Sequence, residues 1–266
     1  MLKYIDIHSH LNLSPLRDNQ AEVIARMIEK KVGTITIGVD FETSKEAIDL
    51  ASLYDFIWAG VGQHPGDSHK EVFDFEKYLE LAKNEKVVCI GECGLDYFRD
   101  NYEETKQKQK EIFRKHVEIA IAVRKPLMMH IRPSKETMDA YEDALSILNE
   151  YKDKIGKNLF GNFHFFVGNI AIAKKILALD FTMSFDGPIT FSRNYDELIK
   201  FLPIESIMAE TDAPFAAPAP YRGKTCEPWM VAEVVKKIAE IKNLPENEVA
   251  EAILANTKRI FNIFLK

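Results

Sequence analysis

The sequence lacks the features that mark secreted, zinc-knuckle and membrane proteins. Its 266 residues include only three cysteines, an odd number without a CxxC spacing, so we expect reduced thiols rather than a disulfide framework or a structural zinc knuckle. It has no run of about 18 apolar residues, and its N-terminus lacks a basic segment followed by an apolar core and a cleavage site. We therefore expect a soluble cytoplasmic protein that has no membrane partner.

An excess of positive charge is also missing. The formal net charge is −6 and the isoelectric point is near 5.7, which excludes the broad basic surface of a protein that coats duplexes non-specifically. A nucleic acid remains possible as a substrate if the positive charge is local and partly supplied by bound metal. The sequence also lacks a GxGxxG turn, which makes an open, doubly wound sheet the second choice of fold.

What the sequence does contain is an alternation of short apolar runs with longer amphipathic segments. Segments 21–31, 104–123 and 136–150 have helical periodicity, and Thr43-Ser44-Lys45-Glu46 has the spacing of a capping box. The β-rich runs span 2–7, 34–39, 56–62, 87–90, 126–129, 159–163, 181–185 and 206–209. Eight strands that alternate with helices predict an α/β fold, a parallel (β/α)₈ TIM barrel, for which about 250 residues are typical.

The predicted organisation is one domain over residues 1–266, because no internal repeat or linker marks a boundary. A proline-rich segment, 212–228, follows the eighth run and precedes a further helical stretch. It is long enough to fold over a barrel mouth, so we expect it to serve the functional site.

Potential metal ligands follow or end the apolar runs. Five of the seven histidines lie at these positions together with two carboxylates: His8, His10, His64, Glu92, His130, His164 and Asp212. In a barrel the carboxyl ends of the strands meet at one mouth, where barrel enzymes assemble their catalytic groups. One such histidine alone would more readily be explained by a backbone hydrogen bond. The whole set would leave ionised groups uncompensated unless cations hold them, so the sequence predicts a metal site.

Three other residues of potential interest receive structural interpretations. His69 lies in a polar loop and His116 in a charge-rich helical segment, and we interpret both as surface residues. Cys93 is adjacent to Glu92 but has no partner at metal-ligand spacing, so we expect a buried free thiol.

Six motifs in order resemble those of the TatD-type metal-dependent hydrolases, a barrel branch of the amidohydrolase superfamily. They are Asp6-Ile-His8-Ser-His10, Gly62-Gln-His64-Pro65, Gly91-Glu92-Cys-Gly94-Leu95-Asp96, His130-Ile-Arg132, Phe163-His164-Phe-Phe166 and Glu210-Thr211-Asp212-Ala-Pro214. The resemblance covers essentially the whole chain. It implies metal-dependent deoxyribonuclease activity or, as in some members, deacylation of D-aminoacyl-tRNA.

The resemblance also implies an arrangement of two divalent metal ions. By position, His8, His10 and Asp212 would hold one ion, His130 and His164 the other, and Glu92 would bridge them. A carboxylate suits the bridge because it has two oxygens. Such mixed nitrogen and oxygen ligation is compatible with magnesium, manganese or zinc.

The remaining polar residues of these motifs receive catalytic or supporting roles. Asp212 can accept a proton from an attacking water. Glu210 either assists it as a second carboxylate or orients a ligand, and Asp6 is expected to orient a ligand rather than bind metal. His64 remains once the ligands are assigned, so it either contacts the substrate as a hydrogen-bond donor or acid, or supports the site.

Substrate contacts are assigned to basic and aromatic residues near the strand ends. Arg132, Arg222 and Lys224 are candidate phosphate contacts, and Phe166 or Tyr97 could stack on a terminal base unless they belong to the core. The leading hypothesis is a deoxyribonuclease that cleaves phosphodiester bonds at single-stranded DNA ends in the 3′ to 5′ direction. The alternative is a D-aminoacyl-tRNA deacylase. A small-molecule amidohydrolase has less need of these cations, and the complete ligand set disfavours a non-catalytic scaffold. A monomer is plausible.

Overall fold

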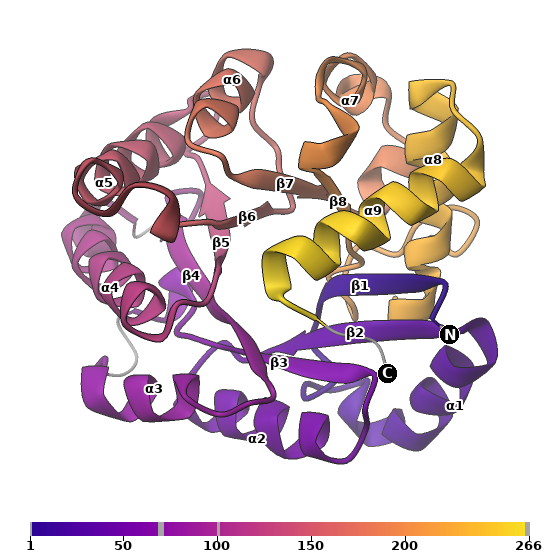
Figure 1. The fold of residues 1–266 in the computed structure, drawn as a ribbon, viewed down its shortest axis with the longest axis horizontal. Helices are drawn as coiled ribbons and strands as arrows, with labels where there is room; N and C mark the ends of the chain where they lie inside the picture. Colours follow the sequence, from indigo (N-terminus) through magenta and orange to yellow (C-terminus); the bar gives the residue numbers. More distant parts are fainter. Residues whose placement is uncertain (1, 69–71, 100–101, 264–266) are drawn as a thin grey trace.

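The computed structural model, which describes residues 2–68, 72–99 and 102–263, contains the predicted barrel. Eight parallel strands pair in chain order from β1 to β8, and the helices surround them (Figure 1). The strands are β1 (Tyr4–Ser9), β2 (Val32–Ile37), β3 (Ile57–Val61), β4 (Val87–Asp96), β5 (Leu127–Arg132), β6 (Gly161–His164), β7 (Thr182–Phe185) and β8 (Ile207–Ala209). The fold class predicted from the sequence is confirmed.

Nine helices are seen in the described part of the chain. They are α1 (Gln20–Lys30), α2 (Phe41–Ser52), α3 (Phe75–Ala82), α4 (Tyr102–Val123), α5 (Asp139–Ile155), α6 (Ile170–Ala178), α7 (Asp196–Phe201), α8 (Val231–Lys242) and α9 (Glu246–Phe261). The helix α2 begins at a capping box three residues earlier than predicted, because the Asp40 carboxylate accepts the Thr43 N–H. None of the described helices is long and apolar enough to cross a membrane.

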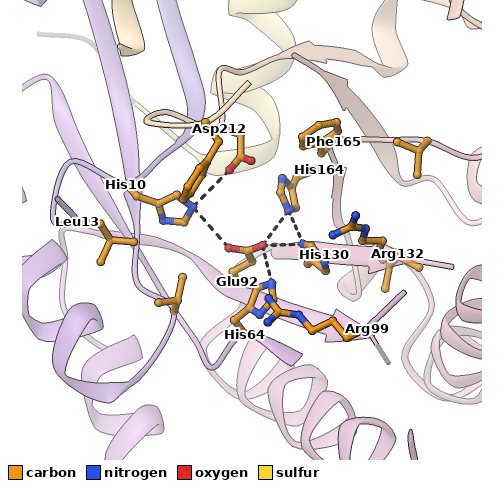
Figure 2. A pocket seen from close by; sticks show the side chains of 14 residues that line it. His10, Leu13, His64, Glu92, Arg99, His130, Arg132, His164, Phe165 and Asp212 are labelled. Carbon is orange, nitrogen blue, oxygen red and sulfur yellow. Dashed lines mark hydrogen bonds and ion pairs between the residues drawn. The ribbon is translucent and has the colours of Figure 1, made fainter. Parts of the chain in front are cut away.

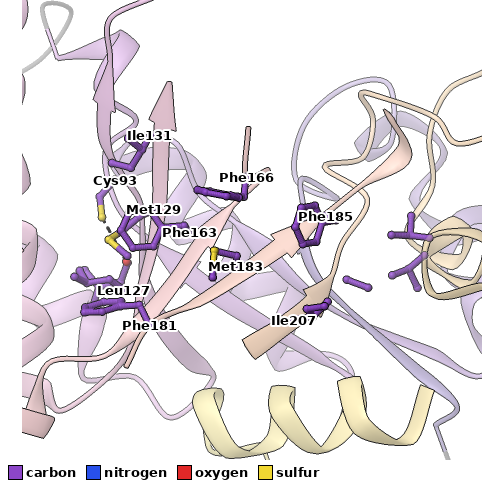
Figure 3. Close-up of a cluster of buried hydrophobic side chains, with 14 of the residues drawn as sticks. Cys93, Leu127, Met129, Ile131, Phe163, Phe166, Phe181, Met183, Phe185 and Ile207 are labelled. Atoms are coloured by element: carbon purple, nitrogen blue, oxygen red, sulfur yellow. Dashed lines mark hydrogen bonds between the residues drawn. The ribbon is translucent and has the colours of Figure 1, made fainter. Parts of the chain in front are cut away.

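Two apolar layers stabilise the barrel. One lies between the strands and the outer helices, and Figure 3 shows part of it around Met129, Phe163 and Met183. The other fills the lumen near the amino ends of the strands, where Ile5, Trp58 and neighbours pack against the end of α9. Helix α9 crosses this end of the barrel (Figure 1). The opposite end is left for polar side chains.

The barrel is nearly closed between its first and last strands by the residues that follow β8. Asp212 donates its backbone N–H to the His8 carbonyl oxygen at 2.9 Å, and His10 donates its N–H to the Ala213 carbonyl oxygen at 2.7 Å. These bonds bring Asp212 beside His8 and His10, although about 200 residues separate them in the sequence.

Four strands extend beyond their predicted ends, namely β1, β4, β5 and β6. Strand β4 continues from Ile90 through Asp96, so Glu92 lies within the strand rather than after it. The extension contains Gly91 and Gly94, with φ of +151° and +136°. A Cβ at either glycine would overlap a carbonyl oxygen of β5, so these positions require glycine. Because glycine interrupts the apolar pattern, the pattern alone placed the end of the strand too early. Strands β1, β5 and β6 similarly include His8, His130 and His164.

The interpretation of His116 as a surface residue is wrong. Its side chain is 1% exposed, its ring nitrogen Nδ1 lies 2.9 Å from the Ile112 carbonyl oxygen, and Nε2 accepts the Gln63 N–H at 3.0 Å. The charges around it in α4 belong to the other face of the helix, which made the segment look exposed. Cys93 is buried and free, as predicted, and His69 lies outside the described residues.

Candidate metal centre and active site

Glu92 lies at the centre of a cluster of histidines at the carboxyl ends of the strands (Figure 2). Its Oε2 atom is 3.5 Å from His8 Nε2 and 3.7 Å from His10 Nε2. Its other oxygen, Oε1, is 2.9 Å from His130 Nδ1 and 3.0 Å from His164 Nε2. The two carboxylate oxygens thus divide four imidazoles into two pairs. This is the arrangement that a carboxylate bridging two cations would have.

The first pair shares a second carboxylate. Asp212 Oδ1 lies 3.4 Å from His10 Nε2 and 3.7 Å from His8 Nε2. His10 Nδ1 lies 3.0 Å from the Ile37 carbonyl oxygen, which can only accept, so the hydrogen of the neutral ring is on Nδ1. Its Nε2 lone pair then faces the oxygens of Glu92 and Asp212. Acceptors that face one another are stabilised by a cation between them, so this donor set fits a divalent metal ion.

Each histidine of the second pair has a carboxylate behind it. His130 Nε2 lies 3.4 Å from Asp96 Oδ2, and His164 Nδ1 lies 3.4 Å from Glu210 Oε1. A carboxylate on the far nitrogen of an imidazole fixes the ring and increases its basicity toward a metal. Asp96 lies in one of the six sequence motifs, but the sequence alone indicates no role for it. Its position as the last residue of the extended strand became visible only once β4 was defined.

The position of Glu210 favours its role in orienting a ligand. Besides facing His164, it accepts the Phe165 N–H at 2.6 Å and the Ser184 hydroxyl at 2.7 Å, and it is fully buried. Both of its oxygens are therefore engaged with protein groups. A carboxylate held in this way is poorly placed to receive a proton from water in the pocket.

Asp6 also has a supporting position. Its carboxylate accepts the backbone N–H groups of His8 and Thr211, at 3.2 and 2.9 Å, and the Thr211 hydroxyl at 2.6 Å. It does not converge on the imidazoles, because the pairing of β1 with β2 shifts register between Asp6 and Ser9 and interrupts the regular alternation of side chains. Asp6 thus holds the backbone at His8 and at Thr211, the residue before Asp212. This fixes the positions from which the His8 and Asp212 side chains extend into the site.

Electrostatic interactions within the cluster favour the ionised form of Glu92. Burial opposes ionisation of Glu92, but positive charge on His64 and His164 holds the Glu92 pKa well below its usual value. Burial likewise opposes charge on His164, yet the Glu210 and Glu92 carboxylates raise the His164 pKa well above its usual value. Both pKa shifts have the same cause, because the carboxylates and the imidazoles of the cluster stabilise each other's charged forms.

His64 faces the cluster with a hydrogen-bond donor. Its Nδ1 atom accepts the Gly66 N–H at 3.0 Å, so a neutral ring carries its hydrogen on Nε2. That Nε2 atom is 3.6 Å from Glu92 Oε1. In this tautomer His64 presents an N–H rather than a lone pair to the site, which suits a substrate contact better than metal ligation.

A pocket of about 500 Å³ lies above the cluster. Its lining includes His10, His64, Glu92, His130, His164 and Asp212, together with Arg99, Arg132, Phe165, Val167 and Phe215. The candidate ligands thus face a space large enough for a small ligand or the end of a polymer. His8 is fully buried beneath it.

Comparisons with known proteins identify the family of this chain. A family model described as TatD related DNase matches residues 5–262. The chain belongs to the TatD family. It is 37% identical to the metal-dependent hydrolase YabD of Bacillus subtilis over 97% of this chain and 98% of that one. It is 32% identical to the metal-dependent hydrolase YcfH of Escherichia coli K12 over 97% of this chain and 96% of that one.

A solved TatD structure has the same fold. The TatD homologue YjjV of Escherichia coli superposes with a TM-score of 0.85 at 25% identity, covering 98% of this chain and 99% of that one.

The substrate contacts predicted for this TatD protein are only partly found at the pocket. Arg132 lines it. Phe166 does not, because its ring is 1% exposed and belongs to the buried cluster (Figure 3). It packs edge-on against the Tyr141 ring. The preceding residue, Phe165, has φ of +47° and lines the pocket instead. Tyr97 is equally buried and contacts Asp143 through its hydroxyl.

The loop after β8 contributes to the pocket through a different residue than predicted. Arg222 stacks on the Phe191 ring, with Cζ 3.9 Å from the ring centroid, and neither Arg222 nor Lys224 lines the pocket. Phe215 of the same loop lines it, and its ring lies 6.2 Å from that of His10. Arg99, which sequence reasoning missed, also lines the pocket and brings a second guanidinium to it.

Proposed function

We propose that this TatD-family hydrolase is a deoxyribonuclease that cleaves phosphodiester bonds at the ends of single-stranded DNA, using two divalent metal ions. The observation that carries the proposal is the composition of one pocket. Its lining combines Glu92 and the histidines His10, His130 and His164 with the guanidinium groups of Arg99 and Arg132, and His8 lies beneath it. Cationic side chains beside metal ligands suit an anionic substrate, whereas a neutral amide gains little from them.

The residues of the pocket then have distinct tasks. When bound, the metal pair supplies an activated water and stabilises the charge that develops on the attacked phosphate. His8, His10 and Asp212 would hold one ion, His130 and His164 the other, and Glu92 both. Asp212 accepts the proton of the attacking water, since its side chain is accessible from the pocket.

His64 donates from Nε2 to the phosphate oxygens or to the leaving oxygen. The rings of Phe165 and Phe215 offer apolar surfaces at the pocket for a terminal sugar or base. The ring of Phe215 is exposed, as expected for a group that contacts a ligand rather than the core.

The proposal is tested by comparing two substrates on the manganese-loaded protein. Release of mononucleotides from end-labelled single-stranded DNA is measured beside deacylation of D-tyrosyl-tRNA. We expect metal-dependent nucleotide release from the 3′ end and much slower deacylation. The Glu92→Ala protein should lack the activity, which excludes a contaminating nuclease.

Two outcomes would replace the proposal. Rapid deacylation without nucleotide release would identify a D-aminoacyl-tRNA deacylase, which needs the same activated water but attacks a carbonyl group. Metal-dependent turnover of neither substrate would contradict both candidate functions.

A further inference from the structure

We propose that Arg99, together with Arg132, forms a phosphate-binding subsite on the His130 side of the pocket, and that Gly66 provides the space in which the Arg99 guanidinium lies. The ligand is a phosphate oxyanion of the substrate strand. The assignment rests on the proposed phosphodiesterase function and specifies where the substrate phosphate is held.

Within the described part of the chain, the Arg99 guanidinium is anchored through one of its nitrogens. Its Nε donates to Asp96 Oδ2 at 3.2 Å, while its side chain is 51% exposed. Asp96 is itself buried and backs His130, so the anchor is rigid. A guanidinium has five N–H donors, and this contact uses only the one on Nε. The two terminal nitrogens are the part of the group suited to bidentate phosphate binding.

Gly66 lies directly against this guanidinium. A Cβ at Gly66 would be 2.7 Å from both Cζ and Nε of Arg99, which is too close for a real contact. Any side chain at this position would therefore displace the guanidinium. The same residue donates its N–H to His64 Nδ1. Arg99 thus lies beside the turn that orients the donor His64 as well as beside the carboxylate behind His130.

Arg132 reaches the same pocket from the adjacent strand. Asp96 and Arg132 are register partners at the ends of β4 and β5, and Arg132 Cζ lies 3.9 Å above the Phe98 ring. Figure 2 shows Arg99 near His64 and Arg132 near His130, both on the side of Glu92 opposite to His10. The stacking fixes the Arg132 guanidinium without using its N–H donors, which remain suited to phosphate oxygens.

The charges in the pocket explain why two arginines are found there. The candidate metal ligands favour bound cations. Two guanidinium groups that line the same pocket would repel those cations unless an anion lies between the cations and the guanidinium groups. The protein as a whole is acidic, with a formal net charge of −6, so this concentration of positive groups is local. A phosphate group satisfies both the metal side and the guanidinium side of the pocket.

The test uses the manganese-loaded enzyme, four variants at Arg99 and Gly66, and one control variant. We expect Arg99→Ala to raise KM for single-stranded DNA, and Ki for inhibition by inorganic phosphate, by about 10- to 100-fold, the range for loss of a hydrogen bond to a charged group. The value of kcat should change by less than about threefold, since Arg99 binds phosphate without taking part in proton transfer. Arg99→Lys should recover part of the affinity.

Gly66→Ala keeps the charge of Arg99 but displaces its guanidinium group, so KM and Ki should rise as they do in Arg99→Ala. If the effect acts through Arg99, the double variant should be no worse than Arg99→Ala alone. The matched control is Arg193→Ala. Arg193 is also an exposed arginine that pairs with an aspartate three residues away, but it does not line the pocket, so KM and Ki should be unchanged.

Equal KM and Ki in Arg99→Ala and the wild type, within twofold, would overturn the subsite while leaving nucleotide release by the wild type intact. A wild type that releases no nucleotides would contradict the proposed function instead. Calorimetric binding of inorganic phosphate to the metal-loaded wild type and variants then still decides the role of Arg99. If Arg99→Ala does not fold, as judged by circular dichroism, Arg99→Lys and Gly66→Ala supply the same comparison.

Discussion

The two ends of the barrel lumen are lined by opposite kinds of side chain. Near the amino ends of the strands, Ile5, Ile35 and Trp58 pack against Phe261 of α9 and exclude water. Near the carboxyl ends, histidines and carboxylates face a pocket of about 500 Å³. The same strands contribute to both ends, so their first residues stabilise the fold and their last residues supply the chemistry. Changes at the two ends should therefore affect different properties.

The largest expected effect is at the open end. Glu92→Gln keeps the shape of the side chain but removes the charge that faces five imidazoles. We expect kcat/KM for DNA to fall about 10³-fold or more, on the scale of losing a group that stabilises charge in the transition state. Stability to urea should be largely retained. Glu197→Gln, at an exposed surface carboxylate, is the control.

The converse substitution is at the closed end. Ile35→Ala removes a fully buried side chain from the lumen and should lower the free energy of unfolding by about 2–5 kcal/mol, measured by urea titration. Below the unfolding transition, kcat/KM should change less than tenfold. A collapse of activity in the folded variant would show that the two ends are not separable in this way.

His116 provides an ionisable group that is buried away from the pocket. Burial lowers its pKa to about 4, against an ordinary value of 6.5. The native state thus favours the neutral ring. The contribution of neutral His116 to the free energy of unfolding is complete above pH 6.5 and is lost as the pH falls toward 4. This loss is at most about 3 kcal/mol. In His116→Gln, the decrease of unfolding free energy between pH 6.5 and 4.5 should be shallower than in the wild type. Parallel curves would contradict the assignment.

The smallest expected effect concerns the carboxylates behind the ligands. Glu210→Gln keeps a side chain that can contact Ser184 but removes the charge facing His164. We expect manganese affinity to fall about 10- to 100-fold, measured by calorimetry, with activity recovered at high metal concentration. Loss of activity that excess metal does not restore would instead support a direct role of Glu210 in proton transfer.

The sequence predicted the barrel and the candidate ligands for one physical reason. Apolar runs are long enough to be recognised, and in a parallel barrel their carboxyl ends must meet, so His10, Glu92 and His164 could be placed together without knowing any loop. The extent of β4 could not be predicted, because Gly91 and Gly94 interrupt its pattern at the positions where β5 approaches.

The substrate contacts were harder to predict because they lie where side-chain direction depends on local backbone and packing. The left-handed backbone at Phe165 places that ring at the pocket and Phe166 in the core. Packing also decides the direction of Arg222, whose guanidinium stacks on the ring of Phe191 from another loop. Arg99 is visible only through its contacts with Asp96 and Gly66. None of these contacts has a periodic signal in the sequence.

The central claim is that the open end holds two divalent ions with Glu92 between them. Its most direct test is the manganese stoichiometry of chelator-stripped protein, measured by calorimetry with electron paramagnetic resonance for the wild type, His10→Ala and His130→Ala. We expect two spin-coupled ions in the wild type. In each variant we expect one uncoupled ion, or one site whose manganese affinity is much weaker. A single ion in the wild type, or two coupled ions of unchanged affinity in either variant, would contradict it.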